Sequence, residues 1–148
     1  VSRPRRGALA LMLGAGLAWI VWPVATYPLL NANQSVVQLM NEVDARIGPE
    51  GQLGLVTWRE EVLYQARRPT VEFGFTRDSA RQMADARAWQ RADPAHRWIL
   101  INADALDSCV IREKVVDMGI ANRVRSALVP GDGNRVGCAP EPLADPAR

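Results

Sequence analysis

The sequence predicts an α/β protein with one N-terminal transmembrane helix, followed by a small domain whose sheet of about four strands is mainly parallel. Two observations lead to this prediction. Residues 7–41 contain no charged residue and no histidine, and they open with a long apolar run. After this stretch, short apolar runs typical of strands alternate with the periodic patterns of amphipathic helices. That alternation is typical of parallel sheets whose strands are joined by crossover helices.

The membrane segment is predicted at residues 7–27. About 20 apolar residues rising about 1.5 Å each span a hydrocarbon core about 30 Å thick. Three arginines lie within residues 3–6, whereas the first basic residue after the segment is Arg46. The positive-inside rule therefore places the N-terminus in the cytoplasm and the rest of the chain outside. We expect residues 1–30 to be a basic flank and a helix in the lipid bilayer of the inner membrane, and residues 31–138 to be a periplasmic domain.

A cleaved signal peptide is the alternative to a retained anchor, because it also begins with basic residues before an apolar stretch. Its cleavage site requires small residues two positions apart, and Ala25 has Pro23 at the earlier position. Pro23 is compatible with an anchor. Proline has no backbone N–H, and near the membrane exit water can donate to the carbonyl that is left without a partner. The pattern favours the anchor. At the other end of the chain, the proline-rich residues 139–148 are predicted to be a disordered tail.

The first half of the domain begins with an amphipathic helix from about residue 35 to residue 47, after which a Gly-Pro pair ends the apolar periodicity. A short buried strand is predicted at residues 53–56. Thr57 and Glu60 have the spacing of a capping box, which predicts a second helix to about residue 67.

The middle of the domain continues the alternation. Residues 71–75 alternate apolar and other residues with period two and are predicted to form a strand. Asp78 or Thr76 is expected to cap a third helix that ends at residue 90. Residues 98–101 form the most apolar predicted strand, as expected for a strand covered on both faces.

In the last third of the domain, the sequence pattern predicts a helix at residues 109–118, with Gly119 as its left-handed end. A strand is predicted at 126–129, followed by a glycine-rich turn and a returning strand at 135–138. The complete order is Rossmann-like in its layering. However, no G-x-G-x-x-G follows the first strand, so the sequence gives no support for a dinucleotide site.

Charge and length limit the classes of function. The chain has 18 Lys plus Arg against 16 Asp plus Glu, and these charges are spread along it. This pattern argues against nucleic acid as a partner. The about 110 residues after the anchor are enough for one small domain. The pairs Arg67, Arg68 and Arg123, Arg125 are candidates for binding phosphate or anionic headgroups, with a solvated basic edge as the plainer interpretation.

Cys109 and Cys138 are the two cysteines of the chain. An external compartment permits disulfides, and two cysteines fit one bridge, which favours a Cys109–Cys138 disulfide over two free thiols. Their spacing does not form C-x-x-C, so redox exchange of the thioredoxin type is not supported.

No residue pattern predicts catalysis within this chain. His96, the one histidine, has no nucleophile or metal partner at motif spacing. None of the serines lies in G-x-S-x-G. Glu60 and Glu61 are adjacent on a predicted helix and therefore point to different faces, which disfavours a pair of cooperating carboxylates. The sequence thus predicts no catalytic residue, metal site or cofactor in this chain.

Several short motifs nevertheless occur in a characteristic order after the apolar helix. They are Tyr27-Pro28, Asn31-Ala-Asn33-Gln-Ser35, Ile47-Gly48, Leu53-Gly-Leu55, Trp58-Arg-Glu-Glu61, Phe73-Gly74, Trp98, Cys109, Gly119 and Asn122-Arg123. Together they resemble the C-terminal end of bacterial membrane glycosyltransferases of family 39, the group of protein mannosyltransferases and lipid A aminoarabinose transferases. The resemblance extends from the last transmembrane helix through the periplasmic domain.

The resemblance implies a role without a catalytic centre. Members of that family transfer sugars from polyprenyl-phosphate donors at the external membrane face, and their catalytic carboxylates lie in the first periplasmic loop, where a metal assists. No position of this chain matches that loop. The resemblance therefore implies an accessory domain whose partners are the rest of a multi-pass transferase and its polyprenyl-phosphate sugar donor. Arg59, Glu61 and Arg123 are the candidate anion or docking contacts.

A single-pass envelope protein whose external domain binds a partner is the alternative function. The chain begins with Val1 rather than Met, which is compatible with a non-ATG start codon or with a longer parent protein. The first possibility suits the envelope protein, and the second suits the transferase.

Overall fold

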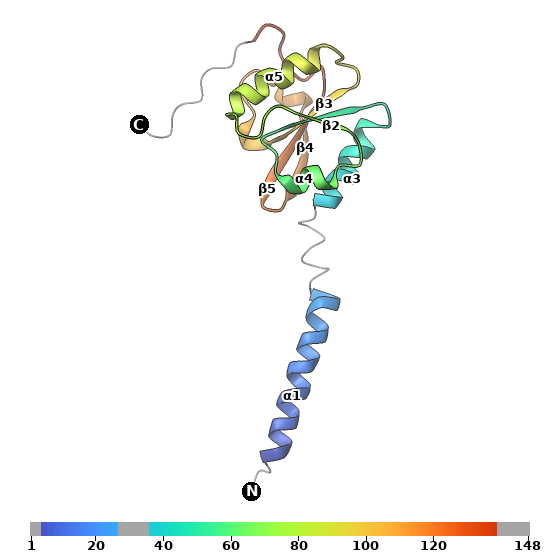
Figure 1. Cartoon of the computed structure of the whole chain (residues 1–148), viewed down its shortest axis with the longest axis vertical. Coiled ribbons are helices and arrows are strands. Elements are labelled where there is room, and N and C mark those ends of the chain that lie inside the picture. The colour runs from blue at the N-terminus through green and yellow to red at the C-terminus, as the bar shows by residue number, and fades with distance from the viewer. Residues whose placement is uncertain (1–3, 27–35, 139–148) are drawn as a thin grey trace, which may run out of the picture. The chain divides into compact units, whose positions relative to one another are not determined.

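The apolar N-terminal stretch forms a helix in the computed structural model, which describes residues 4–26 and 36–138 (Figure 1). Helix α1 (Pro4–Val21) continues into the π-helical segment η1 (Trp22–Thr26), which contains Pro23. Gly7–Thr26 is long and apolar enough to cross a membrane, a test that a signal sequence also passes. The tail predicted at residues 139–148 lies outside the described residues. The helix and the domain that follows form separate compact units.

The domain contains five strands and three α-helices among its described residues, together with two short 3-10 turns. In chain order they are α3 (Val36–Ile47), β1 (Gln52–Val56), α4 (Glu60–Gln65), β2 (Thr70–Glu72), α5 (Ser79–Arg91), β3 (Arg97–Asn102), η2 (Ala103–Ala105), η3 (Arg112–Lys114), β4 (Val116–Ala121) and β5 (Val124–Val129). The expected elements around residues 35–47, 53–56, 98–101 and 126–129 are therefore confirmed.

The strands form one mixed sheet (Figure 1), and their order across it is β2-β1-β3-β5-β4. Strand β1 pairs in parallel with both β2 and β3. Strand β5 pairs antiparallel with β3 and with β4. The domain is α/β, but the prediction of a mainly parallel sheet of four strands is wrong. The difference arises because β4 and β5 form a hairpin, which requires no crossover helix.

The helix predicted at residues 109–118 is absent, and strand β4 takes up the end of that segment. Backbone hydrogen bonds from Ile111 to Gly133 and from Arg135 to Cys109 pair the start of this segment with residues 133–135, and the 3-10 turn η3 follows. Gly119 has φ +74° and lies where the register of β4 against β5 is irregular, so it belongs to a bulge and not to a helix end. The strand predicted at residues 135–138 is not formed. The pairing found beside it is a single antiparallel bridge between Val110 and Asn134.

Of the two predicted helix caps, one is confirmed and the other is wrong. Asp78 caps α5 as expected, because its carboxylate accepts a hydrogen bond from the Arg81 backbone N–H at 2.9 Å. The capping box of Thr57 is wrong, since Arg59 occupies the N-cap of α4. The Thr57 hydroxyl instead accepts a hydrogen bond from the Asn102 backbone N–H at 3.3 Å, which joins the ends of β1 and β3.

Both faces of the central strands are covered. On one face, α3 and α4 pack over Leu53, Leu55 and Leu100. On the other face, α5 and residues 103–115 pack over Val56 and Ile99. Because successive strand residues point to opposite faces, each of these strands has an unbroken apolar sequence.

Gly54 is the one residue of β1 that this packing requires to be small. A Cβ atom at this position would lie 2.9 Å from a ring carbon of Trp89 and 3.0 Å from one of Phe73. Both rings belong to the layer that covers this face of the sheet. The glycine therefore lets the aromatic layer approach the backbone of β1 directly.

A buried ion pair ties the segment after β3 to α5. The Arg87 guanidinium donates to both carboxylate oxygens of Asp107, at 3.1 Å and 2.6 Å, and the two side chains are only 5% and 11% exposed. The Asp107 carboxylate also accepts a hydrogen bond from the Cys109 backbone N–H at 3.0 Å. One carboxylate thus fixes the position of the helix and of the disulfide-bonded loop.

The predicted disulfide between Cys109 and Cys138 is confirmed, with a sequence separation of 29 residues. In the entropic model, closing a loop of this length stabilises the fold by about 3 to 4 kcal/mol. Within the loop, Lys114 donates to Asp132 at 2.6 Å, and this hydrogen bond lowers the pKa of the Asp132 carboxyl. The disulfide and the apolar helix together indicate an extracytoplasmic domain, either membrane-anchored or secreted.

We predict that Asp107→Ala destabilises the domain by about 3 to 5 kcal/mol, because it leaves the Arg87 guanidinium buried without a counter-charge. The matched control is Asp85→Ala, which removes an equally short pair with Arg77, at 2.6 Å, whose side chains are 52% and 56% exposed. Its cost should stay below about 1 kcal/mol. Urea denaturation of the full chain in detergent measures both. Equal costs for the two variants would contradict the assigned role of burial.

Candidate functional site

The candidate site lies at the carboxyl ends of β1 and β3. The crossover helices α4 and α5 lie on opposite faces of the sheet, and the two connections lead to opposite sides of β1, to β2 and then back to β3, while β1 and β3 themselves run parallel. In open α/β sheets this position forms a crevice in which ligands bind. The turn at Asn122 and Arg123 reaches the same end, because β5 begins there and pairs Ser126 with Asn102.

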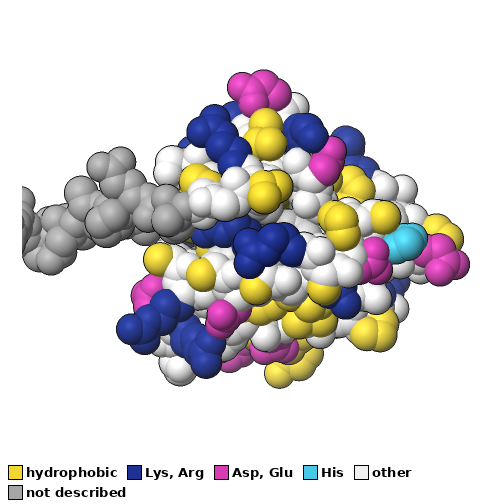
Figure 2. Space-filling view, turned by 90° about the horizontal axis from the view of Figure 1, so that it is seen from above, with side chains coloured by type: hydrophobic (Ala, Val, Ile, Leu, Met, Phe, Trp, Pro, Cys, Tyr) yellow, Lys and Arg dark blue, Asp and Glu magenta, His cyan; other side chains and the backbone are white. Residues whose placement is uncertain are grey.

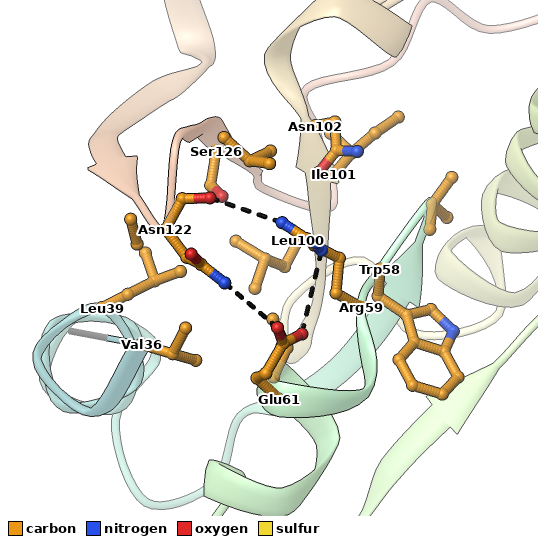
Figure 3. Close-up of a pocket in the computed structure, with 14 residues that line it drawn as sticks. Val36, Leu39, Trp58, Arg59, Glu61, Leu100, Ile101, Asn102, Asn122 and Ser126 are labelled. Carbon is orange, nitrogen blue, oxygen red and sulfur yellow. Dashed lines mark hydrogen bonds and ion pairs between the residues drawn. The ribbon is translucent and has the colours of Figure 1, made fainter. Parts of the chain in front are cut away.

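A small pocket of about 30 Å³ occupies this position (Figure 3). Its walls are mostly apolar and include Val36, Leu39 and Leu100. A volume of this size holds one or two water molecules or a single small substituent. The pocket therefore does not enclose a sugar ring in this conformation.

Three polar side chains meet at the mouth of the pocket, and we call Arg59, Glu61 and Asn122 the rim cluster (Figure 3). The Asn122 amide donates to Glu61 at 3.0 Å, and Arg59 donates to the Asn122 carbonyl at 3.4 Å. The Arg59 Nε and a Glu61 carboxylate oxygen are 3.8 Å apart, and the two side chains are 52% and 47% exposed. Contacts this exposed contribute at most about 1 kcal/mol each, so the rim cluster opens easily.

Two further polar side chains line the pocket more deeply. Ser126 is only 7% exposed, and its hydroxyl has no hydrogen-bond partner among the residues that the structure describes. The Asn102 side-chain amide is half-buried and also lacks a hydrogen-bond partner within the described part of the chain. These groups remain available to whatever enters the pocket.

Backbone strain is concentrated around the pocket. Thr57, Asn122 and Arg123, with φ of 51°, 46° and 66°, are the non-glycine residues with positive φ in the described segments. Asparagine tolerates this region, whereas a β-branched threonine and an arginine are strained there. Thr57 directly precedes Trp58 and Arg59, and Asn122 belongs to the rim cluster. The strained backbone therefore positions side chains at the mouth of the pocket, a common property of functional sites.

The structure brings together two of the three residues that the sequence suggested. Arg59 and Glu61 both belong to the rim cluster. Arg123 lies next to this cluster on the β4–β5 turn, where its exposed side chain has no hydrogen bond or ion pair to the described residues. Sequence reasoning missed Asn102 and Ser126, because isolated polar residues at strand ends have no motif. Their meeting depends on the pairing of β3 with β5.

Of the other basic residues suggested for anion binding, Arg68 and Arg125 have partners, whereas Arg67 is exposed and has no hydrogen bond or ion pair to the described residues. Arg68 donates to Asp44 at 2.7 Å and to the carbonyls of Gly48 and Gly51, which fixes the end of α3. Arg125 lies 3.4 Å from Asp117. These contacts favour a structural role for Arg68, whose pair with Asp44 is mostly buried, whereas the Arg125 pair is 59% exposed on both sides and adds little stability.

The distribution of charged side chains on the surface does not indicate a second site. Figure 2 shows basic and acidic side chains interspersed over one face, and the histidine, His96, pairs with Asp93 at 2.9 Å. The described residues contain no group of three or more His, Cys, Asp or Glu side chains placed to hold a metal ion.

Comparison with protein families, with curated proteins and with solved structures gives no match.

We predict that Arg123→Gly stabilises the domain by about 0.5 to 1 kcal/mol. A non-glycine residue with left-handed backbone costs about 1 to 2 kcal/mol, and the greater freedom of glycine in the unfolded chain offsets part of the gain. Arg123→Ala keeps the strain and should change the free energy of unfolding little. Arg125→Gly, on the adjacent strand, should destabilise. Urea denaturation compares the three, and an Arg123→Gly variant no more stable than Arg123→Ala would show that strain is not the cause.

Proposed function

We propose that this chain is the C-terminal accessory portion of a membrane glycosyltransferase. The transferase moves a sugar from a polyprenyl-phosphate donor at the periplasmic face, with its catalytic loop outside this chain. The main support is that two of the motifs behind the family resemblance, Trp58-Arg-Glu-Glu61 and Asn122-Arg123, meet at one pocket. The Asn122 amide and the Glu61 carboxylate are 3.0 Å apart, although 61 positions separate them in the sequence.

Tyr27-Pro28 and the motif at residues 31–35 lie outside the described residues, and three of the glycine-containing motifs have structural reasons of their own. Gly48 and Gly74 have φ of 69° and 93°, which glycine adopts readily, and Gly54 admits the rings of Trp89 and Phe73. Motifs of this kind specify the fold without indicating a function.

The rim cluster and Arg123 need a different explanation. Their exposed contacts add little stability, and Arg123 is strained and unpartnered among the described residues. An exposed guanidinium is well suited to a bidentate contact with a phosphate or a carboxylate. We therefore assign the rim cluster to contacts with the rest of the transferase, and Arg123 to a contact with that portion or with the donor phosphate held there.

We predict that the domain after the apolar helix lies in the periplasm. Three arginines at residues 3–6 resist translocation, and no basic residue follows the helix until Arg46. A pair of reporters fused after Arg148, one active only in the cytoplasm and one only in the periplasm, reads the topology. Activity of the cytoplasmic reporter would contradict the proposed topology and the compartment that the disulfide requires.

We predict that the isolated chain, in lipid with a polyprenyl-phosphate sugar and an acceptor, gives no turnover. In the full-length parent, Glu61→Ala, Arg123→Ala and Arg123→Gly should lower turnover and leave residual activity, because none of these residues is the catalytic carboxylate. Arg123→Gly is the most informative variant. Because it is expected to stabilise the domain, a loss of turnover in this variant would come from lost docking and not from lost folding. Arg125→Ala is the matched control. Turnover by the isolated chain that disappears on replacing one of its own acidic residues would overturn the proposal.

The coding region upstream of Val1 distinguishes this proposal from the alternative. An in-frame continuation with many hydrophobic segments and an early loop containing Asp or Glu supports the transferase. A ribosome-binding site directly before a GTG codon at Val1 supports the single-pass envelope protein.

A further inference from the structure

We propose that the pocket between the ends of β1 and β3 binds one substituent of a neutral, polyhydroxylated small molecule. Ser126 and Asn102 provide the inner contacts, and the rim cluster provides the outer ones (Figure 3). This inference goes beyond the proposed function, because it concerns a ligand of this domain itself and holds whether or not a catalytic portion accompanies the chain.

The inner polar groups are the first argument. A hydroxyl that lines a pocket and has no protein partner can hydrogen-bond to whatever enters the pocket. Ser126 lines this pocket at 7% exposure and has no hydrogen-bond partner among the described residues, and Asn102, which pairs with it across β3 and β5, adds an amide that both donates and accepts. Two unpartnered groups that line one pocket indicate a polar occupant.

The balance of charge at the mouth is the second argument, and it selects a neutral occupant. Arg59 and Glu61 are one cation and one anion 3.8 Å apart. A phosphate or carboxylate that approached Arg59 would also meet the Glu61 carboxylate, and the repulsion would offset the attraction. A hydroxyl group fits both, because it accepts a hydrogen bond from a guanidinium and donates one to a carboxylate.

The walls and the volume of the pocket are the third argument. Val36, Leu39, Val62, Leu100 and Val124 provide apolar walls, which suit a ligand with a carbon face beside its hydroxyl groups. The volume of about 30 Å³ accepts one hydroxymethyl-sized substituent, and the remainder of the ligand then lies over the rim cluster. So few buried atoms correspond to weak binding, with a Kd of about 1 mM.

The experiment is a titration of the full chain in detergent micelles, followed by nitrogen–proton NMR. The probes are methyl glucoside and inositol as neutral polyols, and inorganic phosphate as the anion, each to about 100 mM, well above the expected Kd. The informative signals are the side-chain amides of Asn102 and Asn122 and the backbone amide of Ser126. We expect at least one polyol, and not phosphate, to give saturable shifts confined to these residues.

Variants determine whether the pocket is the site. Ser126→Ala removes the inner hydroxyl and should weaken binding about fivefold, the effect of losing one hydrogen bond. Ser108→Ala, at an exposed serine outside the pocket, is the matched control and should leave the titration unchanged. Val124→Phe should block the mouth and abolish the shifts, and it provides a second test if the serine variant folds poorly.

Three outcomes would overturn the inference. They are the absence of shifts with both polyols, unchanged binding by the folded Ser126→Ala and Val124→Phe variants, and tighter binding of phosphate than of either polyol at the same residues. The experiment involves no transfer chemistry. A titration without shifts would therefore overturn the ligand proposal alone and not the proposed transferase role. Conversely, evidence against the transferase role would not change the meaning of the titration.

Discussion

The parallel pairing of β1 with β3 is the constraint on which the rest of the domain depends. Five residue pairs align these strands, and both strands are buried between α3 and α4 on one face and α5 on the other. Because the two crossover helices lie on opposite faces and lead to opposite sides of β1, a crevice forms at the carboxyl ends of β1 and β3. The pocket and its rim cluster occur in this crevice, where α4 contributes Glu61 and Val62 to the wall. The site is thus a consequence of the order in which the strands are connected.

The sequence predicted the elements in which local pattern and tertiary environment agree. Residues 98–101 are apolar throughout, and they form a central strand covered on both faces. The hairpin of β4 and β5 was missed because its turn, at Asn122 and Arg123, lacks the Asn-Gly signal, and because the bulge at Gly119 interrupts the alternation of β4. Long-range hydrogen bonds and a disulfide decide the structure of that region, and a local pattern does not contain them.

The candidate site was predictable to the extent that it lies in contiguous motifs. Arg59 and Glu61 stand two positions apart in one motif, so their proximity followed from the sequence. Asn122 was visible only as the neighbour of Arg123, and its contact with Glu61 depends on how the β4–β5 turn reaches the pocket. Asn102 and Ser126 face each other because β5 runs antiparallel to β3, which the sequence analysis did not predict. Sites assembled at strand ends are found from topology more readily than from motifs.

The irregular register of β4 also affects how the domain behaves beside other copies. Strands β4 and β2 form the two edges of the sheet, and an exposed edge strand invites pairing with a second molecule. Here β2 has only three residues and follows Pro69, which has no N–H to donate, while the bulge at Gly119 distorts β4. Neither edge therefore presents a long, flat row of free backbone groups. Both edges are thus poor templates for strand pairing between copies of this domain.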